Sequence, residues 1–210
     1  MSFLFRRRVL LTATGVGLLG ALVLAACAGR PRGDDSLPLS GDDLVPGATI
    51  IETHQIDIDA PAATVWPWLV QLGYERGGFY SFDLLERLAG VGMTNARRIE
   101  PQWQDLAVGD QVRLAADAAL VVARLEPERC LVLSSDGGAA PPGAGMDFDF
   151  SWAFVLDELD DHSSGHCCLR IRERYRPRRG ATTAVVRAMR PVARLMTYGM
   201  MWGLRRRCRA

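Results

Sequence analysis

Two residues with acid–base side chains interrupt rows of apolar residues in this sequence, His54 and Glu173. Around each of them apolar and polar side chains alternate, which is the pattern of a half-buried strand, and both side chains fall on the inward face. An imidazole and a carboxylate buried together would form a pair with shifted pKa values, able to act as general acid and base on an enolisable ligand. The same two groups could instead hold a ligand hydroxyl or simply satisfy each other.

Other polar candidates are fewer. Tyr80 and Asp83 follow a Gly77-Gly78 bend, although Asp83 also suits the cap of a helix. The sequence contains no GxSxG, HExxH or CxxC motif, and the glycine pair lacks the lysine and spacing of a phosphate-binding loop. We therefore expect no metal and no cofactor.

Four cysteines fall within the predicted domain. The adjacent Cys167 and Cys168 point to opposite faces of a strand, so a bond between them is not expected. Cys130 could pair with one of them in an oxidising compartment, and buried free thiols are the alternative. The sequence leaves the state of Cys208 open.

The elements that would position these residues can be read from periodicity. Alternation predicts a first strand from residue 49, and helical spacing predicts a helix after Pro61, with Asp59 as its cap. A second short helix is expected up to Gly90. Later strands are predicted at 112–114, 119–125, 130–133, 147–157 and 167–175.

The strand at 147–157 has the clearest pattern, because its inward face is almost entirely aromatic. The residues on that face are Phe148, Phe150, Trp152, Phe154 and Leu156. On the next strand an arginine row, Arg170, Arg172 and Arg174, faces away from the apolar side. That row indicates either an anion site or a solvated face paired with Asp147 and Asp149.

A long helix is predicted over 181–207. One stripe at helical spacing contains Val185, Met189, Val192, Met196, Gly199 or Met200, and Gly203. The flexible methionines would make an adaptable wall, although ordinary core packing is the alternative for each of them. The closing arginines suit the negative end of the helix or anionic lipid headgroups.

The first 27 residues have the pattern of an export signal. Three arginines precede an apolar run over 9–26, which ends in Leu24-Ala25-Ala26-Cys27 and looks like a bacterial lipobox. An acylated Cys27 and an uncleaved single-span anchor are both compatible with this run. Either one would place the domain on the extracytoplasmic side of the membrane. Residues 28–47, rich in Gly, Pro, Asp and Ser, suggest a flexible tether.

Several runs together resemble the START-type, polyketide-cyclase-like helix-grip superfamily, also called SRPBCC. These runs are IDAPAATVWPWLVQLG, RGGFYSFDLLERL, EPQWQDLAVGD and SWAFVL. The resemblance implies an α+β fold over 48–208, with two short helices after the first strand and a curved antiparallel sheet wrapped around the long C-terminal helix. It also makes the first and last strands antiparallel neighbours, which would bring His54 close to Glu173.

A helix-grip fold implies an internal cavity, because a curled sheet and one helix rarely fill the space between them. The side chains expected to line it are Tyr80, Trp103, Phe150, Trp152, Phe154, Tyr175, Met189 and Met196. The favoured interpretation is a membrane-tethered protein that binds an apolar small molecule or lipid. A cyclase or dehydratase using His54 and Glu173, and an interaction module with a filled core, are the alternatives. A net charge of +1 gives no indication of nucleic-acid binding.

Overall fold

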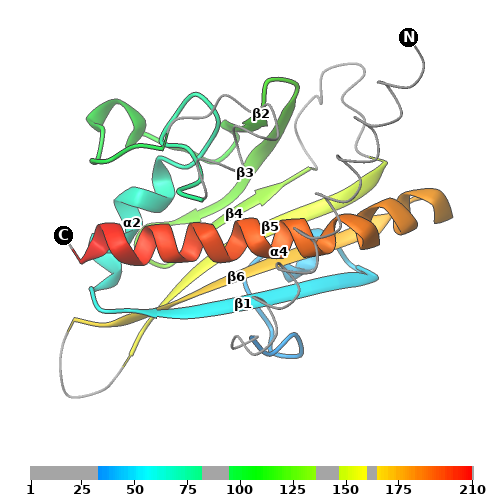
Figure 1. Cartoon of the computed structure of the whole chain (residues 1–210), viewed down its shortest axis with the longest axis horizontal. Coiled ribbons are helices and arrows are strands. Elements are labelled where there is room, and N and C mark those ends of the chain that lie inside the picture. Colours follow the sequence, from blue (N-terminus) through cyan, green and yellow to red (C-terminus); the bar gives the residue numbers. More distant parts are fainter. Residues whose placement is uncertain (1–32, 82–94, 136–146, 160–164, 210) are drawn as a thin grey trace, which may run out of the picture.

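The computed structural model describes residues 33–81, 95–135, 147–159 and 165–209. An antiparallel six-stranded sheet in the order β1-β6-β5-β4-β3-β2 curves around one long helix, α4 (Figure 1). This arrangement confirms the α+β helix-grip fold. The elements are η1 (Asp42–Leu44), β1 (Ile50–Ile58), α2 (Ala62–Val70), η2 (Pro101–Trp103), β2 (Gln111–Ala115), β3 (Ala118–Glu126), β4 (Cys130–Ser134), β5 (Phe148–Glu158), β6 (Cys167–Pro177) and α4 (Gly180–Cys208).

The strands match the expected alternation closely. In β5, Phe150, Phe154 and Leu156 belong to the main core cluster, and Phe148 and Trp152 pack against it. The first and last strands, β1 and β6, are antiparallel neighbours as expected. The second short helix, and Asp83 with it, would lie outside the described residues.

The start of α2 differs from the sequence prediction. Pro61 occupies the N-cap position, and its side chain has no oxygen that could accept a capping hydrogen bond. The backbone N–H of Ala62 instead donates to Oε1 of Glu158 at 3.0 Å. Asp59 does not cap this helix, because its carboxylate pairs with Arg209 near the end of α4. A carboxylate from a distant strand therefore supplies the cap.

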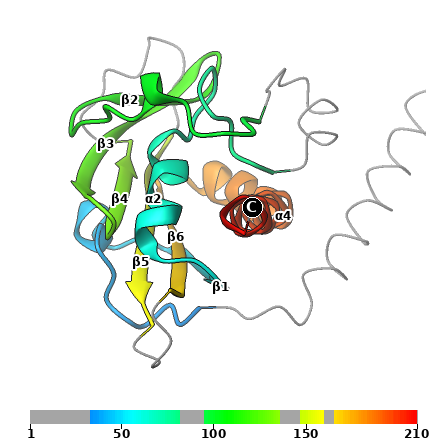
Figure 2. The ribbon, with the colours of Figure 1, turned by 90° about the vertical axis from the view of Figure 1, so that its left-hand side faces the viewer.

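The outer face of the sheet is covered, not solvated. Arg172 is only 1% exposed. Its guanidinium donates to Oδ2 of Asp42 at 2.7 Å, to the carbonyl of Leu37 at 2.7 Å and to that of Asp34 at 2.8 Å. Residues 33–47 thus pack against the face opposite α4, which corrects the prediction of a flexible tether for this part of the chain (Figure 2).

The arginine row is therefore divided. Arg172 is buried under the N-terminal segment because every donor there meets a carbonyl, hydroxyl or carboxylate, which a buried charge requires. Among the described residues, Arg170 pairs with Asp157, and Arg172 and Arg174 pair with Asp42, so the predicted pairing of this row with Asp147 and Asp149 is wrong. Asp149 instead pairs with Arg176, at the exposed end of the strand, at 2.6 Å. Asp149 itself is buried and holds Arg178 as well. The prediction of a uniformly solvated face was wrong.

The helix α4 crosses the concave side of the sheet (Figures 1 and 2). Most of its buried residues, including Thr197, Met200 and Leu204, lie in the second half, and Val186 is the one buried residue of the first half. Three members of the predicted stripe, Val185, Met189 and Val192, are 61%, 54% and 51% exposed. The first half of the stripe is therefore not core, because few described groups cover it.

The structure tests the predicted alternatives for the cysteines. Among the described residues, the four cysteines are free thiols and no disulfide bond joins them; they are Cys130, Cys167, Cys168 and Cys208. Burial raises the pKa of Cys167 to about 12, which keeps that thiol protonated. No helix in the described part of the chain is long and apolar enough to cross a membrane.

Candidate functional site

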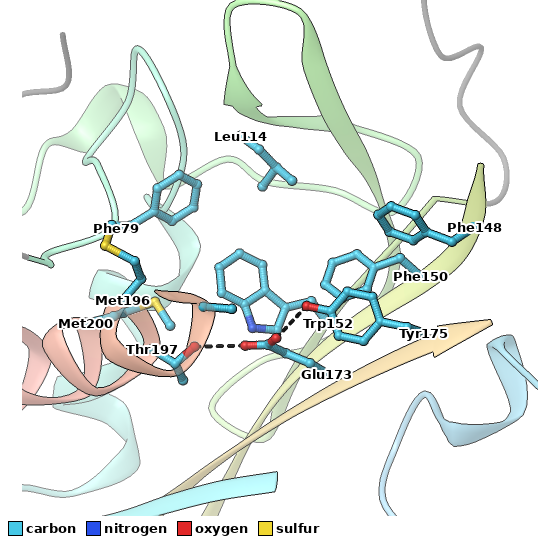
Figure 3. Close-up of a pocket in the computed structure, with 11 residues that line it drawn as sticks. Phe79, Leu114, Phe148, Phe150, Trp152, Glu173, Tyr175, Met196, Thr197 and Met200 are labelled. Atoms are coloured by element: carbon cyan, nitrogen blue, oxygen red, sulfur yellow. Dashed lines mark hydrogen bonds between the residues drawn. The ribbon is translucent and has the colours of Figure 1, made fainter. Parts of the chain in front are cut away.

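A cavity of about 280 Å³ lies between the inner face of the sheet and α4 (Figure 3). Its walls come from β2, β5, β6 and α4, with Phe79 from the loop after α2. Among the described residues that line it, Glu173 contributes the only carboxylate, and Thr197 and Tyr175 contribute the only hydroxyls. The residues that line it are Phe79, Leu114, Phe148, Phe150, Trp152, Glu173, Tyr175, Ala193, Met196, Thr197 and Met200.

The aromatic wall follows from strand register. Phe150 of β5 lies directly opposite Tyr175 of β6, and their ring centroids are 4.6 Å apart. Trp152 packs on Phe79 at 5.8 Å on the cavity side and on Phe154 at 4.8 Å. The cross-strand pair of Phe150 and Tyr175 stabilises the sheet. Aromatic rings in contact with one another therefore form the sheet side of the cavity wall.

A second, smaller lobe of about 150 Å³ adjoins the main cavity along the first half of α4. The two lobes share Phe148, Glu173, Tyr175 and Ala193. Val185 and Met189, both more than half exposed, line the smaller lobe. These exposed apolar side chains place the opening of the smaller lobe at the start of the helix.

Glu173 is the polar centre of the main cavity. It is 6% exposed, and its two oxygens accept hydrogen bonds from the hydroxyls of Thr197 at 2.8 Å and Tyr175 at 2.6 Å. Burial, and then the neighbouring Glu173 carboxylate, raise the pKa of Tyr175, so this phenol stays protonated and acts as the donor. No arginine or histidine forms an ion pair with Glu173 among the described residues.

Glu52 lies beside this centre but has a different environment. Arg190 and Arg194 of α4 both donate to it, the second at 2.6 Å, and His54 Nε2 lies 3.6 Å from Oε2. Burial alone would raise the pKa of the Glu52 carboxyl, but His54, Arg194 and Arg190 outweigh burial and lower it to about 2. Glu52 is therefore ionised and joins β1 to the helix.

The expected His54–Glu173 pair is not formed. In the β1–β6 register His54 lies opposite Ile171, and Glu52 lies opposite Glu173. His54 is buried, its ring meets the ring of Tyr198 edge-on at 5.0 Å, and neither ring nitrogen has a hydrogen bond within the described residues. His54 does not line either lobe, so the two groups do not face one ligand.

Of the eight side chains predicted to line the cavity, five do so. Phe150, Trp152, Tyr175 and Met196 line the main lobe. Met189 lines the smaller lobe, which Tyr175 lines as well. The other three, Tyr80, Trp103 and Phe154, do not line either lobe.

The three excluded aromatics have other partners. The Tyr80 hydroxyl donates to the carbonyl of Trp68 at 3.0 Å, within the core. Phe154 is fully buried in the same core. Trp103 ends η2, where its carbonyl accepts a hydrogen bond from Arg76 at 2.9 Å. On β5, an inward-facing aromatic ring therefore lies in the cavity wall or in the core according to its position along the strand: Phe150 and Trp152 line the cavity, and Phe154 lies in the core.

Sequence reasoning missed several lining residues. Ala193 and Thr197 were not identified, although Ala193 lies three residues before Met196 and Thr197 four residues after Ala193, which are helical spacings. Met200 belonged to the predicted helix stripe as an alternative to Gly199 and was not named as a lining residue. Leu114 was placed on a strand without a role. Glu52, Arg190 and Arg194 were not identified, because only the packing of α4 on β1 brings them together.

The described residues contain no group of three or more His, Cys, Asp or Glu side chains that could hold a metal ion. The polar groups at the cavity are a carboxylate, two hydroxyls and one indole N–H. This set can orient a ligand by hydrogen bonds.

Comparison with known proteins gives matches in solved structures only. No family model matches the chain, and no curated protein does. Protein MLL2253 from Mesorhizobium loti is 19% identical, with 74% of this chain and 96% of that chain covered and a TM-score of 0.36. The polyketide_cyc-like protein Cgl2372 from Corynebacterium glutamicum is 15% identical, with 77% and 92% covered and a TM-score of 0.41.

Norcoclaurine synthase from Thalictrum flavum is also similar, at 11% identity, with 86% of this chain and 96% of that chain covered and a TM-score of 0.40. A second structure of that enzyme holds dopamine and hydroxybenzaldehyde. At these identities and TM-scores the similarity carries no activity or ligand over to this chain.

Proposed function

We propose that this protein binds an apolar small molecule in the cavity between the sheet and α4, and that its N-terminal segment holds it at a membrane. The observation that carries the binding proposal is the main lobe, which has room for a ligand and is walled by five aromatic side chains and two methionines around one carboxylate. Concave apolar space with a few polar groups is typical of small-molecule sites.

The size of the cavity limits the ligand. An apolar cavity of about 150 Å³ is enough to bind benzene. The main lobe, at about 280 Å³, therefore suits a molecule of about two fused rings, and the smaller lobe would accept an extension toward the start of α4. Burial of such a ligand would be driven by the apolar surface removed from water.

A cyclase or dehydratase activity has weaker support. General acid–base catalysis needs both groups within reach of one ligand. Glu173 lines the cavity, but His54 does not. Glu52, which lies beside His54, is already paired with two arginines. Binding without chemistry is therefore the function that the geometry supports best.

The membrane part of the proposal rests on the sequence. An apolar run over 9–26 follows three arginines and ends at Cys27. Such a run would hold the chain at a bilayer either through acylation of Cys27 or as a single span. The domain would then lie on the extracytoplasmic side, close to a source of apolar molecules.

Binding can be tested by filling the cavity. Ala193 lines both lobes, so Ala193→Trp would occupy the space of a ligand. We expect titration calorimetry of the full chain in nanodiscs, with empty nanodiscs subtracted, to show saturable binding of 2-methylnaphthalene. Ala193→Trp should weaken that binding by at least tenfold, on the order of 1.4 kcal/mol.

Ala188 is the matched control, because it is exposed on the same helix and lines neither lobe. Ala188→Trp should bind the probe as the wild type does. Equal loss in both variants, or no saturable binding in the wild type, would contradict the proposal.

A further inference from the structure

One polar atom at the cavity has no partner. Nε1 of Trp152 is buried and makes no hydrogen bond within the described part of the chain. An indole N–H can only donate, and a buried donor without an acceptor costs about 1–3 kcal/mol. Because Trp152 lines the main lobe, an acceptor could reach this atom from inside the cavity.

The carboxylate of Glu173 lies next to this orphan donor. Trp152 and Glu173 are directly opposite each other in the β5–β6 register, and both line the main lobe. In Figure 3 the indole of Trp152 and the carboxylate of Glu173 are seen at the same side of the cavity, with Thr197 and Tyr175 flanking the carboxylate. No hydrogen bond joins Trp152 Nε1 to Glu173, so the pair leaves a donor and an acceptor facing the same space.

Glu173 has capacity for another donor. An ionised carboxylate offers about four lone-pair sites. The hydroxyls of Tyr175 and Thr197 occupy one site on each oxygen. The nearby guanidinium groups of Arg190 and Arg194 are directed at Glu52 instead. A ligand donor could therefore bind Glu173 without displacing a protein group.

We propose, resting on the binding function proposed above, that the ligand carries a hydroxyl group that bridges Trp152 and Glu173. Its oxygen accepts from Nε1–H of Trp152, and its proton is donated to the Glu173 carboxylate. The two protein groups require a single atom that both accepts and donates, and a hydroxyl does so. The ligand class is therefore an apolar alcohol or phenol.

Other polar groups satisfy only half of this arrangement. An ammonium group can donate to Glu173 but cannot accept from the indole. A ketone can accept from the indole but cannot donate, and a carboxylate would be repelled by Glu173. A water molecule could bridge the two groups as a hydroxyl would, and the ligand would then need no polar group of its own.

Three probes of similar size separate these possibilities. They are 2-naphthol, which donates and accepts, 2-methoxynaphthalene, which only accepts, and 2-methylnaphthalene, which does neither. With the full chain in nanodiscs, we expect 2-naphthol to bind at least tenfold more tightly than 2-methylnaphthalene, with the methoxy compound between them. Equal affinities would overturn the hydroxyl proposal and indicate a bridging water, while leaving apolar binding intact. Absence of binding by all three would overturn the binding function itself.

Two conservative variants identify the residues. Trp152→Phe keeps an aromatic ring and removes the donor, so the ratio of the 2-naphthol affinity to the 2-methylnaphthalene affinity should fall to about threefold or less. Glu173→Gln, which keeps the shape and weakens the acceptor, should lower the same ratio. An unchanged ratio in either folded variant would overturn that residue's role. If a variant does not fold, the probe series on the wild type still decides the proposal.

Discussion

At the scale of single residues, two buried glutamates on neighbouring strands have separate tasks. Glu52 and Glu173 lie opposite each other in the β1–β6 register. Glu52 is neutralised by Arg190 and Arg194, whereas Glu173, as far as the described residues go, accepts hydrogen bonds from two hydroxyls alone and faces the cavity. The first therefore attaches the helix to the sheet, and the second remains available to a ligand.

The attachment predicts a dependence of stability on pH. The pKa of Glu52 is lowered from an ordinary value of 4.5 to about 2 in the folded protein. Its contribution is fully present above about pH 4.5 and is lost as the pH falls toward 2. Because the arginine side chains are 30% and 28% exposed, we expect the loss to be roughly 2 kcal/mol.

Glu52→Gln provides the measurement. The variant should be less stable than the wild type at pH 7 in thermal or urea unfolding, and the difference should shrink between about pH 4.5 and pH 3. Other carboxylates titrate in both proteins, so only the difference is informative. A difference that stays constant over this range would show that the Glu52 cluster does not carry the effect.

Some of these residues could be predicted from the sequence and others could not. Alternation within one strand correctly placed His54 and Glu173 inside. The partners of Glu52 are 138 and 142 residues away along the chain, so they depend on the rotation of α4 about its axis. Local patterns contain no information on that rotation. The expected His54–Glu173 pair is not formed because the β1–β6 register places Glu52, and not His54, opposite Glu173.

At the scale of elements, the second half of α4 is fixed against the core by a glycine. A Cβ atom at Gly203 would lie 2.0 Å from the carbonyl oxygen of Tyr80 and 2.9 Å from its Cβ. The helix therefore approaches the backbone of this loop more closely than any other residue allows. That contact sets the distance between α4 and the neighbouring Phe79 at the cavity wall.

Gly203→Ala should destabilise the protein by about 3 kcal/mol, because a backbone atom must move to admit the methyl group. Gly180→Ala is the matched control in the same helix, since nothing lies within 4 Å of a Cβ at Gly180. The control should leave the free energy of unfolding unchanged or raise it by up to about 1 kcal/mol. Urea unfolding measures both, and equal effects would mean that the close approach is not formed.

The positions of the strands were largely predictable from the sequence. The packing of residues 33–47 over the outer face of the sheet was not. The predicted ranges overlap each of the six described strands, from period-two alternation for β1, β5 and β6 and from short apolar runs between turn residues for β2, β3 and β4. Residues 33–47 have the composition of a linker, yet Val45 is fully buried and Asp42 holds Arg172. The stability of this segment comes from a buried arginine on a distant strand, which composition does not reveal.

At the scale of the whole molecule, the proposal joins a cavity to a membrane segment. If residues 1–27 carry the membrane attachment, removal of residues 1–32 should move the protein from the membrane fraction to the soluble fraction. The lipobox-like run predicts that the full chain incorporates a labelled fatty acid and that Cys27→Ser does not. A full chain that stays in the membrane unlabelled would indicate a single-span anchor, and a truncated chain that stays there would contradict the tether.

The central claim is that an apolar ligand occupies the space between the sheet and α4, and methionine-methyl NMR tests it most directly. Met196 and Met200 line the main lobe, whereas the neighbouring Met201 is buried and does not. During titration of the full chain with 2-methylnaphthalene, we predict saturable shifts of the Met196 and Met200 methyl signals and a much smaller shift at Met201. Shifts that never saturate, or that are as large at Met201, would contradict the account.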